Sequence, residues 1–275
     1  MQIIHTASDL RMRLACERAI AFVPTMGNLH DGHLDLVRLA RQHGQCVVAS
    51  IFVNPLQFGP SEDFDKYPRT LEADCEKLQG LADMVFAPSV AEMYPERQTI
   101  FVEPPPIANE LCGAFRPGHF RGMATVVLKL FNLVQPQAAI FGKKDYQQLT
   151  IIRQMVAQFN LPIAIIAAET ARAADGLALS SRNQYLSADE RAVAPLLYRT
   201  LQEISGRLQA GEKNMEQIQE QAVKMLATQG WKPEYVAIRN QAALAIPAGG
   251  EQKLVILAAA RLGQTRLIDN VEVCL

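Results

Sequence analysis

The sequence has almost no net charge, since its 275 residues carry 27 Lys and Arg against 28 Asp and Glu. A chain so balanced lacks the broad basic surface of a general nucleic-acid-binding protein. It also lacks any apolar run near the roughly 18 residues that a membrane-spanning helix needs, and charged residues interrupt the N-terminal segment where a signal peptide needs an apolar core. We therefore expect no nucleic-acid partner and no membrane association, although a local basic pocket for one small anion is still allowed.

Cysteine is scarce and its spacing indicates no cluster. The five cysteines are odd in number, widely scattered and never arranged as CxxC. This pattern argues against both a disulfide framework and a zinc cluster. It is typical of a protein of the reducing cytoplasm, which is the predicted location.

Short apolar runs alternate with amphipathic segments along the first two thirds of the chain. The apolar runs predict strands at 19–23, 46–53, 83–87, 138–141 and 163–168. The segments between them predict helices at 34–42, 70–81, 125–134 and 146–159. Strands joined through helices imply right-handed crossovers. The predicted fold class is therefore α/β, with a Rossmann-like parallel sheet flanked by helices.

The last third of the chain has a different pattern. Ser187 followed by Glu190 predicts a capped helix start. Helices are expected at 187–209 and 214–229, and strands at 235–239, 253–260 and 266–273. Grouped helices followed by grouped strands predict a smaller C-terminal α+β domain. We expect residues 1–175 to bind nucleotide and substrate, and residues 176–275 to form a lid domain.

A loop with two histidines, PTMGNLHDGH at 24–33, follows the first predicted strand directly. In an open parallel sheet such a loop lies at the carboxyl ends of the strands, where ligands bind. Gly27 and Gly32 allow close backbone approach, and free N–H groups at a helix start attract anions. His30 and His33 are i, i+3 neighbours, so both rings can face one phosphate. Histidines that only cap a turn or bind a stray metal are the alternative, but HxGH between a strand and a helix favours nucleotide binding.

Two amides follow the next predicted strand in FVNPLQF, residues 52–58. Gln57 can donate to a carboxylate and accept from a hydroxyl at once, which suits a small hydroxy acid. The alternative is a turn formed by Asn54 and Pro55 with a surface Gln57 beside it.

Two further segments carry groups that suit a triphosphate. In FGKKDYQQL, residues 141–149, a lysine can contact phosphate oxygens, while Asp145 can hold Mg²⁺ or a ribose hydroxyl. In DGLALSSRN, residues 175–183, Ser180 and Arg182 offer a hydroxyl and a fork of donors for the β- and γ-phosphates. This second segment lies at the predicted domain junction, where a loop could close over the nucleotide and exclude water.

These motifs carry a resemblance to a known family. HxGH after the first strand is the mark of the nucleotidyltransferase superfamily, which includes the class I aminoacyl-tRNA synthetases. Within it, the four segments and the C-terminal ARLGQTRLIDN resemble the pantoate–β-alanine ligase family over essentially the whole chain. The resemblance implies an ATP-dependent, AMP-forming ligase of pantothenate (vitamin B5) and coenzyme A biosynthesis. Pantoate attacks the α-phosphate of ATP, and β-alanine then displaces AMP from pantoyl adenylate. It also implies Mg²⁺ and a homodimer.

The resemblance implies roles for individual residues. The implied catalytic residues are His33, His30, Lys144, Ser180 and Arg182. The implied ATP-binding residues are Met26, Gly27, Asn28, Leu29, His30, Asp31, Gly32, His33, Gly142, Lys143, Lys144, Asp145, Ala171, Leu179, Ser180, Ser181 and Arg182. The implied substrate-binding residues are Gln57 for pantoate and β-alanine, Gln148 for pantoate, and also Asn54 and Tyr67. No metal ligands are assigned, and Asp74 is only a weak candidate for an outer ligand of Mg²⁺.

The chain departs from the family pattern at four positions. Lys143 stands where the family usually has an acidic residue, and Cys112 stands where it has an acid. Glu169 lies in a segment that departs from the usual VPT-containing sequence, and Leu179 stands for a methionine. We expect Lys143 to leave Lys144 and Asp145 in their roles and to alter the affinity for the nucleotide. Leu179 is apolar like methionine, so packing against adenine should be kept.

Two other functions stay open at this stage. One is a nucleotidyltransferase that modifies another small acid or a phosphate-bearing acceptor and keeps the nucleotide in its product. The other is an RNA-binding relic of a synthetase, which the near-zero charge disfavours. The sequence assigns no base that deprotonates β-alanine.

Overall fold

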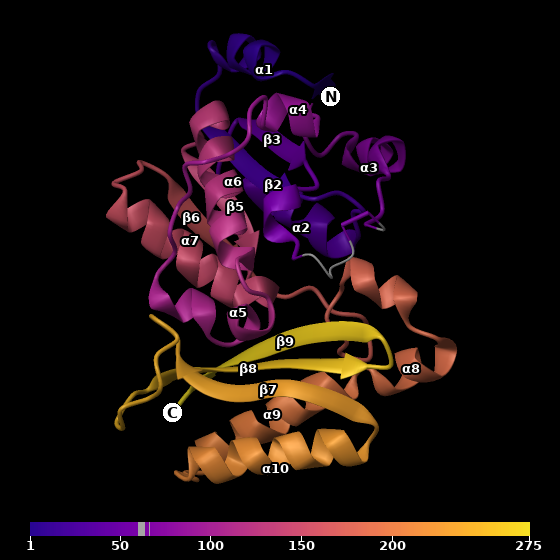
Figure 1. Ribbon diagram of the computed structural model, residues 1–275, viewed down its shortest axis with the longest axis vertical. Coiled ribbons are helices and arrows are strands. Elements are labelled where there is room, and N and C mark those ends of the chain that lie inside the picture. The colour runs from indigo at the N-terminus through magenta and orange to yellow at the C-terminus, as the bar shows by residue number, and fades with distance from the viewer. Residues whose placement is uncertain (60–63, 66) are drawn as a thin grey trace.

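Six parallel strands form the larger of two sheets in the computed structural model, which describes residues 1–59, 64–65 and 67–275 (Figure 1). The strands are β1 (Gln2–Ile4), β2 (Ile20–Thr25), β3 (Cys46–Ile51), β4 (Met84–Phe86), β5 (Ala138–Gly142) and β6 (Ala164–Ala168). They lie in the order β1-β4-β3-β2-β5-β6. The chain thus runs from β2 outward to β3 and β4, and then returns to the other side of β2. This reversal makes the boundary between β2 and β5 the switch point of the sheet.

Helices cover both faces of this sheet. One face packs against α1 (Ala7–Leu14), α6 (His119–Val134) and α7 (Tyr146–Gln158), and the other against α2 (Asp31–Ala40) and α3 (Leu71–Leu78). Neighbouring residues of a strand enter opposite cores, as Phe22 and Val23 do in β2. Strands buried on both faces need continuous apolar runs, which explains why they are so apparent in the sequence. Short helices, α4 (Val90–Met93) and α5 (Cys112–Phe115), lie in the connections, together with the single turns η1 (Pro55–Gln57) and η2 (Pro106–Asn109).

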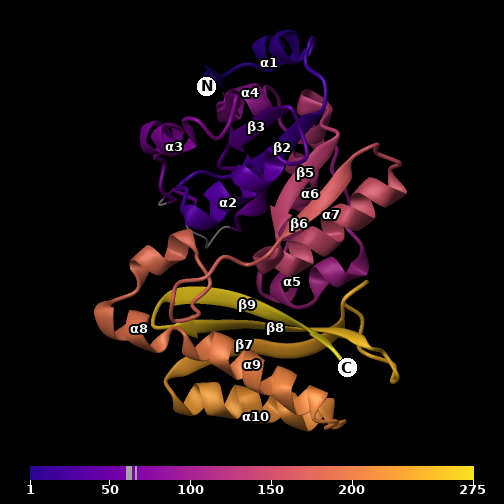
Figure 2. The same cartoon turned by 180° about the vertical axis from the view of Figure 1, so that it is seen from behind.

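The C-terminal part forms an antiparallel sheet of β7 (Trp231–Asn240), β8 (Lys253–Leu262) and β9 (Thr265–Cys274). Its outer face packs against α9 (Leu196–Gln209) and α10 (Met215–Thr228), with α8 (Ala188–Val193) beside them. Both views show the three strands lying between these helices and the end of the parallel sheet (Figures 1 and 2). A small apolar cluster, which includes Tyr146 of α7 and Val255 of β8, joins the two parts.

The predicted fold class is confirmed, and the differences are local. The expected helix at 187–209 is two helices, because Pro195, which has no N–H to donate, separates α8 from α9. The Ser187 cap is present, since its hydroxyl oxygen accepts a hydrogen bond from the Glu190 N–H (3.2 Å). The expected helix at 125–134 begins earlier, at His119, and α1 and β1 were not predicted. The domain boundary after residue 175 stays a prediction. No helix in the described part of the chain is long and apolar enough to cross a membrane.

Candidate functional site

A cavity of about 1060 Å³ lies between the carboxyl ends of the parallel strands and the second sheet. Its walls include the ends of β2 and β5, the segment after β6 and the hairpin between β8 and β9. These are the positions at which the switch point predicts a ligand site. The predicted site residues on its wall are Met26, His30, Gly32, His33, Tyr67, Gly142, Lys144, Asp145, Gln148, Ala171, Leu179, Ser180, Ser181 and Arg182.

The two histidines lie side by side at the start of α2, with ring centroids 4.0 Å apart. The His30 N–H donates a hydrogen bond to Nδ1 of His33 (3.3 Å). An accepting Nδ1 places the proton of a neutral ring on Nε2, so His33 presents an Nε2–H donor. His30 Nδ1 is buried and has no hydrogen-bond partner among the described residues. The pair therefore offers donor and acceptor capacity that the protein itself does not use.

Both rings are neutral at physiological pH. Burial, followed by the nearby His33 and Lys144, lowers the pKa of His30 from 6.5 to about 3. Burial, followed by Lys144 and Lys77, lowers the pKa of His33 to about 4. The rings thus act through their dipoles and N–H groups. The positive charge of the cavity wall comes from other side chains, which are Arg116, Lys144, Arg182, Arg261 and Arg266.

The loop that carries the histidines is held by helix α3. Oδ2 and Oδ1 of Asp74 accept hydrogen bonds from the N–H groups of Asn28 and Leu29, both at 2.8 Å. Lys77, one turn further along α3, donates to the carbonyl oxygen of Leu29 (2.6 Å). Gly27 has φ +81°, and a Cβ there would lie 3.0 Å from Asp74 Oδ2. The loop therefore needs glycine at 27 and a carboxylate at 74.

These contacts correct three expectations. The N–H groups of Asn28 and Leu29 face Asp74, so they are not free to bind phosphate, and the Leu29 side chain lies in the core. Asp74 is completely buried and its oxygens are occupied by N–H groups and by the Thr70 hydroxyl, so the weak assignment as a Mg²⁺ ligand does not fit. Gly27 and Asp31 do not line the cavity, and their assignment to ATP stays a prediction.

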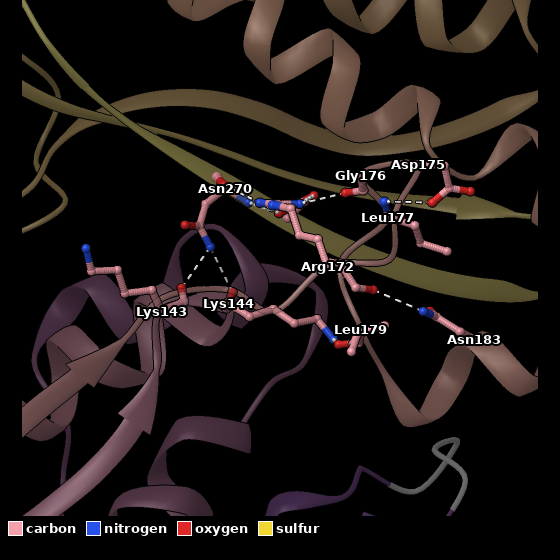
Figure 3. A network of polar contacts seen from close by, with 11 residues as sticks. Lys143, Lys144, Arg172, Asp175, Gly176, Leu177, Leu179, Asn183 and Asn270 are labelled. Carbon is pink, nitrogen blue, oxygen red and sulfur yellow. Dashed lines mark hydrogen bonds and ion pairs between the residues drawn. The ribbon is translucent and has the colours of Figure 1, made fainter. Parts of the chain in front are cut away.

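Lys144 joins two of the predicted motifs directly. It lies in the turn η3 (Lys143–Asp145) after β5, and its Nζ donates to the carbonyl oxygen of Leu179 (2.7 Å) (Figure 3). Burial lowers its pKa from the ordinary lysine value. The turn itself is held by Asn270 of β9, whose amide donates to the carbonyl oxygens of Lys143 (2.8 Å) and Lys144 (2.9 Å). The second sheet thus fixes the direction of the Lys144 side chain.

The segment with Ser180 and Arg182 closes the far side of the cavity. Ser180 caps the turn η4 (Ser181–Tyr185) by accepting from the Arg182 N–H (3.2 Å). Upstream, Arg172 forms a two-pronged ion pair with Asp269 of β9 (2.7 and 2.8 Å) and stacks over the Tyr198 ring, 3.6 Å from its centroid. β9 therefore anchors this segment as well as the turn with Lys144.

Lys143 does not face the cavity, which corrects its assignment to ATP. Its side chain points away from that of Lys144 (Figure 3). Its Nζ forms ion pairs with Glu169 (2.6 Å) and Glu272 (2.7 Å). The physical reason is local: the carboxylates of Glu169 and Glu272, on elements next to the turn, attract the ammonium.

The predicted substrate residues divide into two groups. Gln148 and Tyr67 line the cavity, whereas Asn54 and Gln57 lie behind it. Asn54 is buried, with its amide donating to Gln57 Oε1 (3.1 Å) and Gly122 O (3.2 Å), and its oxygen accepting from Leu56 N–H and the Tyr94 hydroxyl. Its hydrogen-bonding capacity is used within the protein, so it positions Gln57 and does not contact a substrate.

Gln57 stays a proposed substrate residue because it lies next to the wall. Its Nε2 is 3.0 Å from the sulfur of Met26, which lines the cavity. The backbone carbonyl oxygen of Gln57 accepts a hydrogen bond from His119 Nδ1 (2.8 Å). Arg116, on the cavity wall, donates to His119 Nε2 (3.0 Å). A guanidinium only donates, which fixes this tautomer of His119.

Sequence reasoning missed the contribution of the β8–β9 hairpin. Arg266 and Asp269 line the cavity, and the sequence ARLGQTRLIDN served only as part of the family resemblance. The signal present there was three charged residues, Arg266, Asp269 and Glu272, inside one predicted strand. Asp63, which follows the second motif, lies outside the described residues.

The fold and cavity define an α/β enzyme that binds a nucleotide at the switch point of a parallel sheet. A family model described as pantoate-beta-alanine ligase matches residues 2–272. The pantothenate synthetase of Nitrosospira multiformis is 58% identical over 275 residues, which are 99% of this chain and 98% of that protein. That of Methylobacillus flagellatus is 60% identical over 273 residues, with the same coverage.

Solved structures give the same result. A pantothenate synthetase from Thermus thermophilus is 44% identical, with a TM-score of 0.93 and 100% of both chains covered. A pantoate-beta-alanine ligase from Francisella tularensis is 34% identical, with a TM-score of 0.84 and coverage of 98% and 97%. This chain belongs to the pantoate–β-alanine ligase family. It is an ATP-dependent ligase that forms the amide bond between pantoate and β-alanine.

Proposed function

We propose that the cavity carries out this ligation in two steps on residues of four segments. In the first step a pantoate carboxylate oxygen attacks the α-phosphorus of ATP, and the bond to pyrophosphate breaks. In the second step the β-alanine nitrogen attacks the acyl carbon of pantoyl adenylate, the C–N bond forms, and AMP leaves. The observation that carries this proposal is the meeting of His30, His33, Lys144 and Arg182 on one wall. The Francisella tularensis structure, described as complexed with Beta-gamma ATP and Beta-alanine, supports it.

The first step needs charge stabilisation and positioning more than proton transfer, because a carboxylate is already ionised near neutral pH. We assign the His33 Nε2–H as the main donor to the reacting phosphate, with His30 beside it. Lys144, Ser180 and Arg182 hold the phosphate tail. The adenine and ribose are proposed to lie against Gly142, Ala171 and Leu179. All of these groups line the same cavity, and donors that are held in fixed positions around a reacting phosphate lower the barrier by preorganisation.

Gln148 and Tyr67 are proposed to bind pantoate from the wall, and Gln57 to reach it past Met26. Pantoate carries one carboxylate and two hydroxyls, so amides and a phenol that both donate and accept suit it. The second step also requires β-alanine to lose an ammonium proton, and no residue is assigned to that task.

Mg²⁺ is proposed as the partner of the triphosphate. No cluster of three or more possible ligands occurs among the described His, Cys, Asp and Glu residues. On the cavity wall Asp269 and Glu169 are paired with cations, while Asp145 has an exposed side chain. This donor set fits an ion held mainly by phosphate oxygens and water with Asp145 as a single protein ligand. When bound, Mg²⁺ neutralises the charge of the leaving pyrophosphate.

A homodimer in the cytoplasm completes the proposal. The five cysteines are all free, as a reducing location permits. Light scattering coupled to size exclusion tests the dimer, and a mass of one chain, 30.4 kDa, contradicts it.

The adenylate is tested by pantoate-dependent exchange of labelled pyrophosphate into ATP without β-alanine. We expect exchange with pantoate, and release of AMP and pantothenate once β-alanine is added. AMP retained on a phosphate-bearing acceptor would instead favour the other nucleotidyltransferase reaction. No exchange under these conditions contradicts the two-step course.

The role of His33 is tested by His33→Ala. Loss of one oriented donor to the transition state lowers turnover by about 10²-fold or more, whereas the affinity for ATP falls much less. Rapid-quench measurement of adenylate formation and equilibrium binding of ATP separate the two effects. Near-normal turnover in this variant removes His33 from the role.

A further inference from the structure

The ammonium of Lys143 joins three elements at the seam between the two sheets. It lies 2.6 Å from Glu169 Oε1, just after β6, and 2.7 Å from Glu272 Oε2 on β9. Glu272 also accepts a hydrogen bond from the Tyr146 hydroxyl (2.8 Å) at the start of α7. One cation in the turn η3 is thus shared between the parallel sheet and the antiparallel sheet.

One of these carboxylates belongs to the cavity wall. Glu169 lines the cavity beside Thr170 and Ala171, and its side chain is 82% exposed. An unneutralised carboxylate at this place would repel a triphosphate. Lys143, with only 19% of its side chain exposed, supplies the opposite charge from behind the wall. Burial lowers the pKa of Lys143, but the hydrogen bonds that it donates to Glu169 and Glu272 outweigh burial and raise that pKa, so the ammonium stays charged.

The same ion pairs act on the neighbouring catalytic residue. Lys143 and Lys144 share one turn, and both of their carbonyl oxygens accept from Asn270 of β9. Glu272 lies two residues further along that strand, so the ion pair and the amide contacts fix the turn from the same side. The turn is therefore held by its backbone and by the Lys143 side chain, which restricts the directions that the Lys144 side chain can take.

We propose that Lys143 is a positioning residue for the nucleotide: it neutralises Glu169 at the cavity wall and ties the turn that presents Lys144 to strand β9. The proposal rests on the cavity being the ATP site, as argued above. It assigns to Lys143 an indirect effect on ATP, in place of the direct contact that the sequence predicted.

The test uses Lys143→Met, Glu169→Gln and the double variant. Lys143→Met leaves the Glu169 carboxylate without its cation. We expect the KM for ATP to rise about fivefold, which is the effect of one added negative charge several Å from a phosphate. Added salt should reduce this increase because it screens the exposed carboxylate. The double variant carries neither of these two charges, so its KM should fall below that of Lys143→Met, and any increase left above the wild type measures the lost tie to Glu272. Lys143→Arg, which keeps the charge, should remain close to the wild type.

A matched control separates this role from a general loss of stability. Arg207→Met breaks an ion pair between α9 and Glu212, which follows that helix (2.6 Å), and neither residue lines the cavity. It should lower the thermal midpoint without raising KM for ATP. The proposal is overturned if Lys143→Met behaves as this control does, or if adding Glu169→Gln to Lys143→Met does not lower the KM for ATP. Turnover and pyrophosphate exchange by the wild type test the proposed function separately.

Discussion

The histidine pair shows how burial decides the chemistry of a residue. HxGH in the sequence leaves open whether the imidazoles are neutral donors or charged groups. In the structure the rings are 4.0 Å apart and near Lys144, so a proton on either ring would meet like charges with little solvent. The pair therefore offers N–H groups and no positive charge to the phosphate of the proposed reaction, and its protonation is coupled to the free energy of unfolding.

This coupling predicts a pH dependence of stability. The pKa of His33 falls from 6.5 to about 4 on folding, so between these values the unfolded chain binds a proton that the folded chain does not. Stability is then complete above pH 6.5 and is lost as the pH falls towards 4. The contribution of His33 between pH 7.5 and pH 5 is about 2 kcal/mol. Glutamine does not titrate, so in His33→Gln the free energy of unfolding should fall by about 2 kcal/mol less than in the wild type between pH 7.5 and pH 5. Urea unfolding at several pH values measures this. If the free energy of unfolding depends on pH equally in both proteins, the assignment is wrong.

Single residues were predictable where their motif is local and where nothing distant redirects them. His30, His33, Lys144 and Arg182 line the cavity, as three of the four segments indicated. Lys143 does not, because Glu169 and Glu272 determine the direction of its side chain. Those partners are far away in the sequence, and no pattern around Lys143 shows them.

At the scale of elements, the loop that carries the proposed catalytic histidines depends on a helix, α3, to which no catalytic residue is assigned. Helix α3 places Asp74 and Lys77 one turn apart on the same face, where they bind the N–H groups and the carbonyl oxygen of residues 28 and 29. The sequence predicted α3 as an amphipathic helix but not its contact with the loop. A charged residue on a helix is usually solvated, and only its complete burial reveals the role of Asp74.

Asp74→Asn tests this support. The substitution exchanges one accepting oxygen for an amide that donates, so one of the two N–H groups loses its partner inside the protein. We expect a loss of about 2 kcal/mol in the free energy of unfolding, together with lower turnover because the histidines are less well held. Urea unfolding and adenylate formation measure the two effects. Glu76→Gln, at an exposed position on the same helix, is the matched control. If both variants lose the same stability and the same rate of adenylate formation, Asp74 does not hold the loop.

Elements with strong periodicity were predictable, and weak or interrupted ones were not. The buried strands β2, β3 and β5 appear as continuous apolar runs in the sequence. By contrast, β1 has three residues at the edge of the sheet and two of them are exposed, so it has no apolar signal. The N-terminal turn of α6, which begins at His119 after Gly118, has a polar and glycine-containing sequence that resembles a loop.

At the scale of the whole molecule, β9 joins the parts of the active site that the sequence separates. Asp269 holds the segment that leads to Ser180 and Arg182, Asn270 holds the turn of Lys144, and Glu272 pairs with Lys143. These residues come from the last ten positions of the chain. The sequence predicted a strand here and a separate lid domain, but the contacts between the two sheets depend on tertiary packing that periodicity does not encode.

The ion pair between Arg172 and Asp269 is the contact through which this arrangement can be tested. Asp269 is 4% exposed, and both of its oxygens accept hydrogen bonds from the guanidinium. Arg172→Met therefore leaves a buried carboxylate without its cation, and we expect a loss of about 3 to 5 kcal/mol in the free energy of unfolding. Turnover should fall as well, because the segment with Ser180 and Arg182 loses its attachment to β9.

The double variant Arg172→Met, Asp269→Asn distinguishes a buried charge from a lost contact. With the carboxylate removed, much of the stability should return, since the largest cost of the single variant is the unpaired ion. Turnover should stay low, because neither side chain then links the segment to the strand. Arg191→Met, which breaks an exposed pair with Asp175 (2.6 Å), should cost less than about 1 kcal/mol. If turnover recovers along with stability in the double variant, the ion pair between Arg172 and Asp269 is not needed to position Arg182.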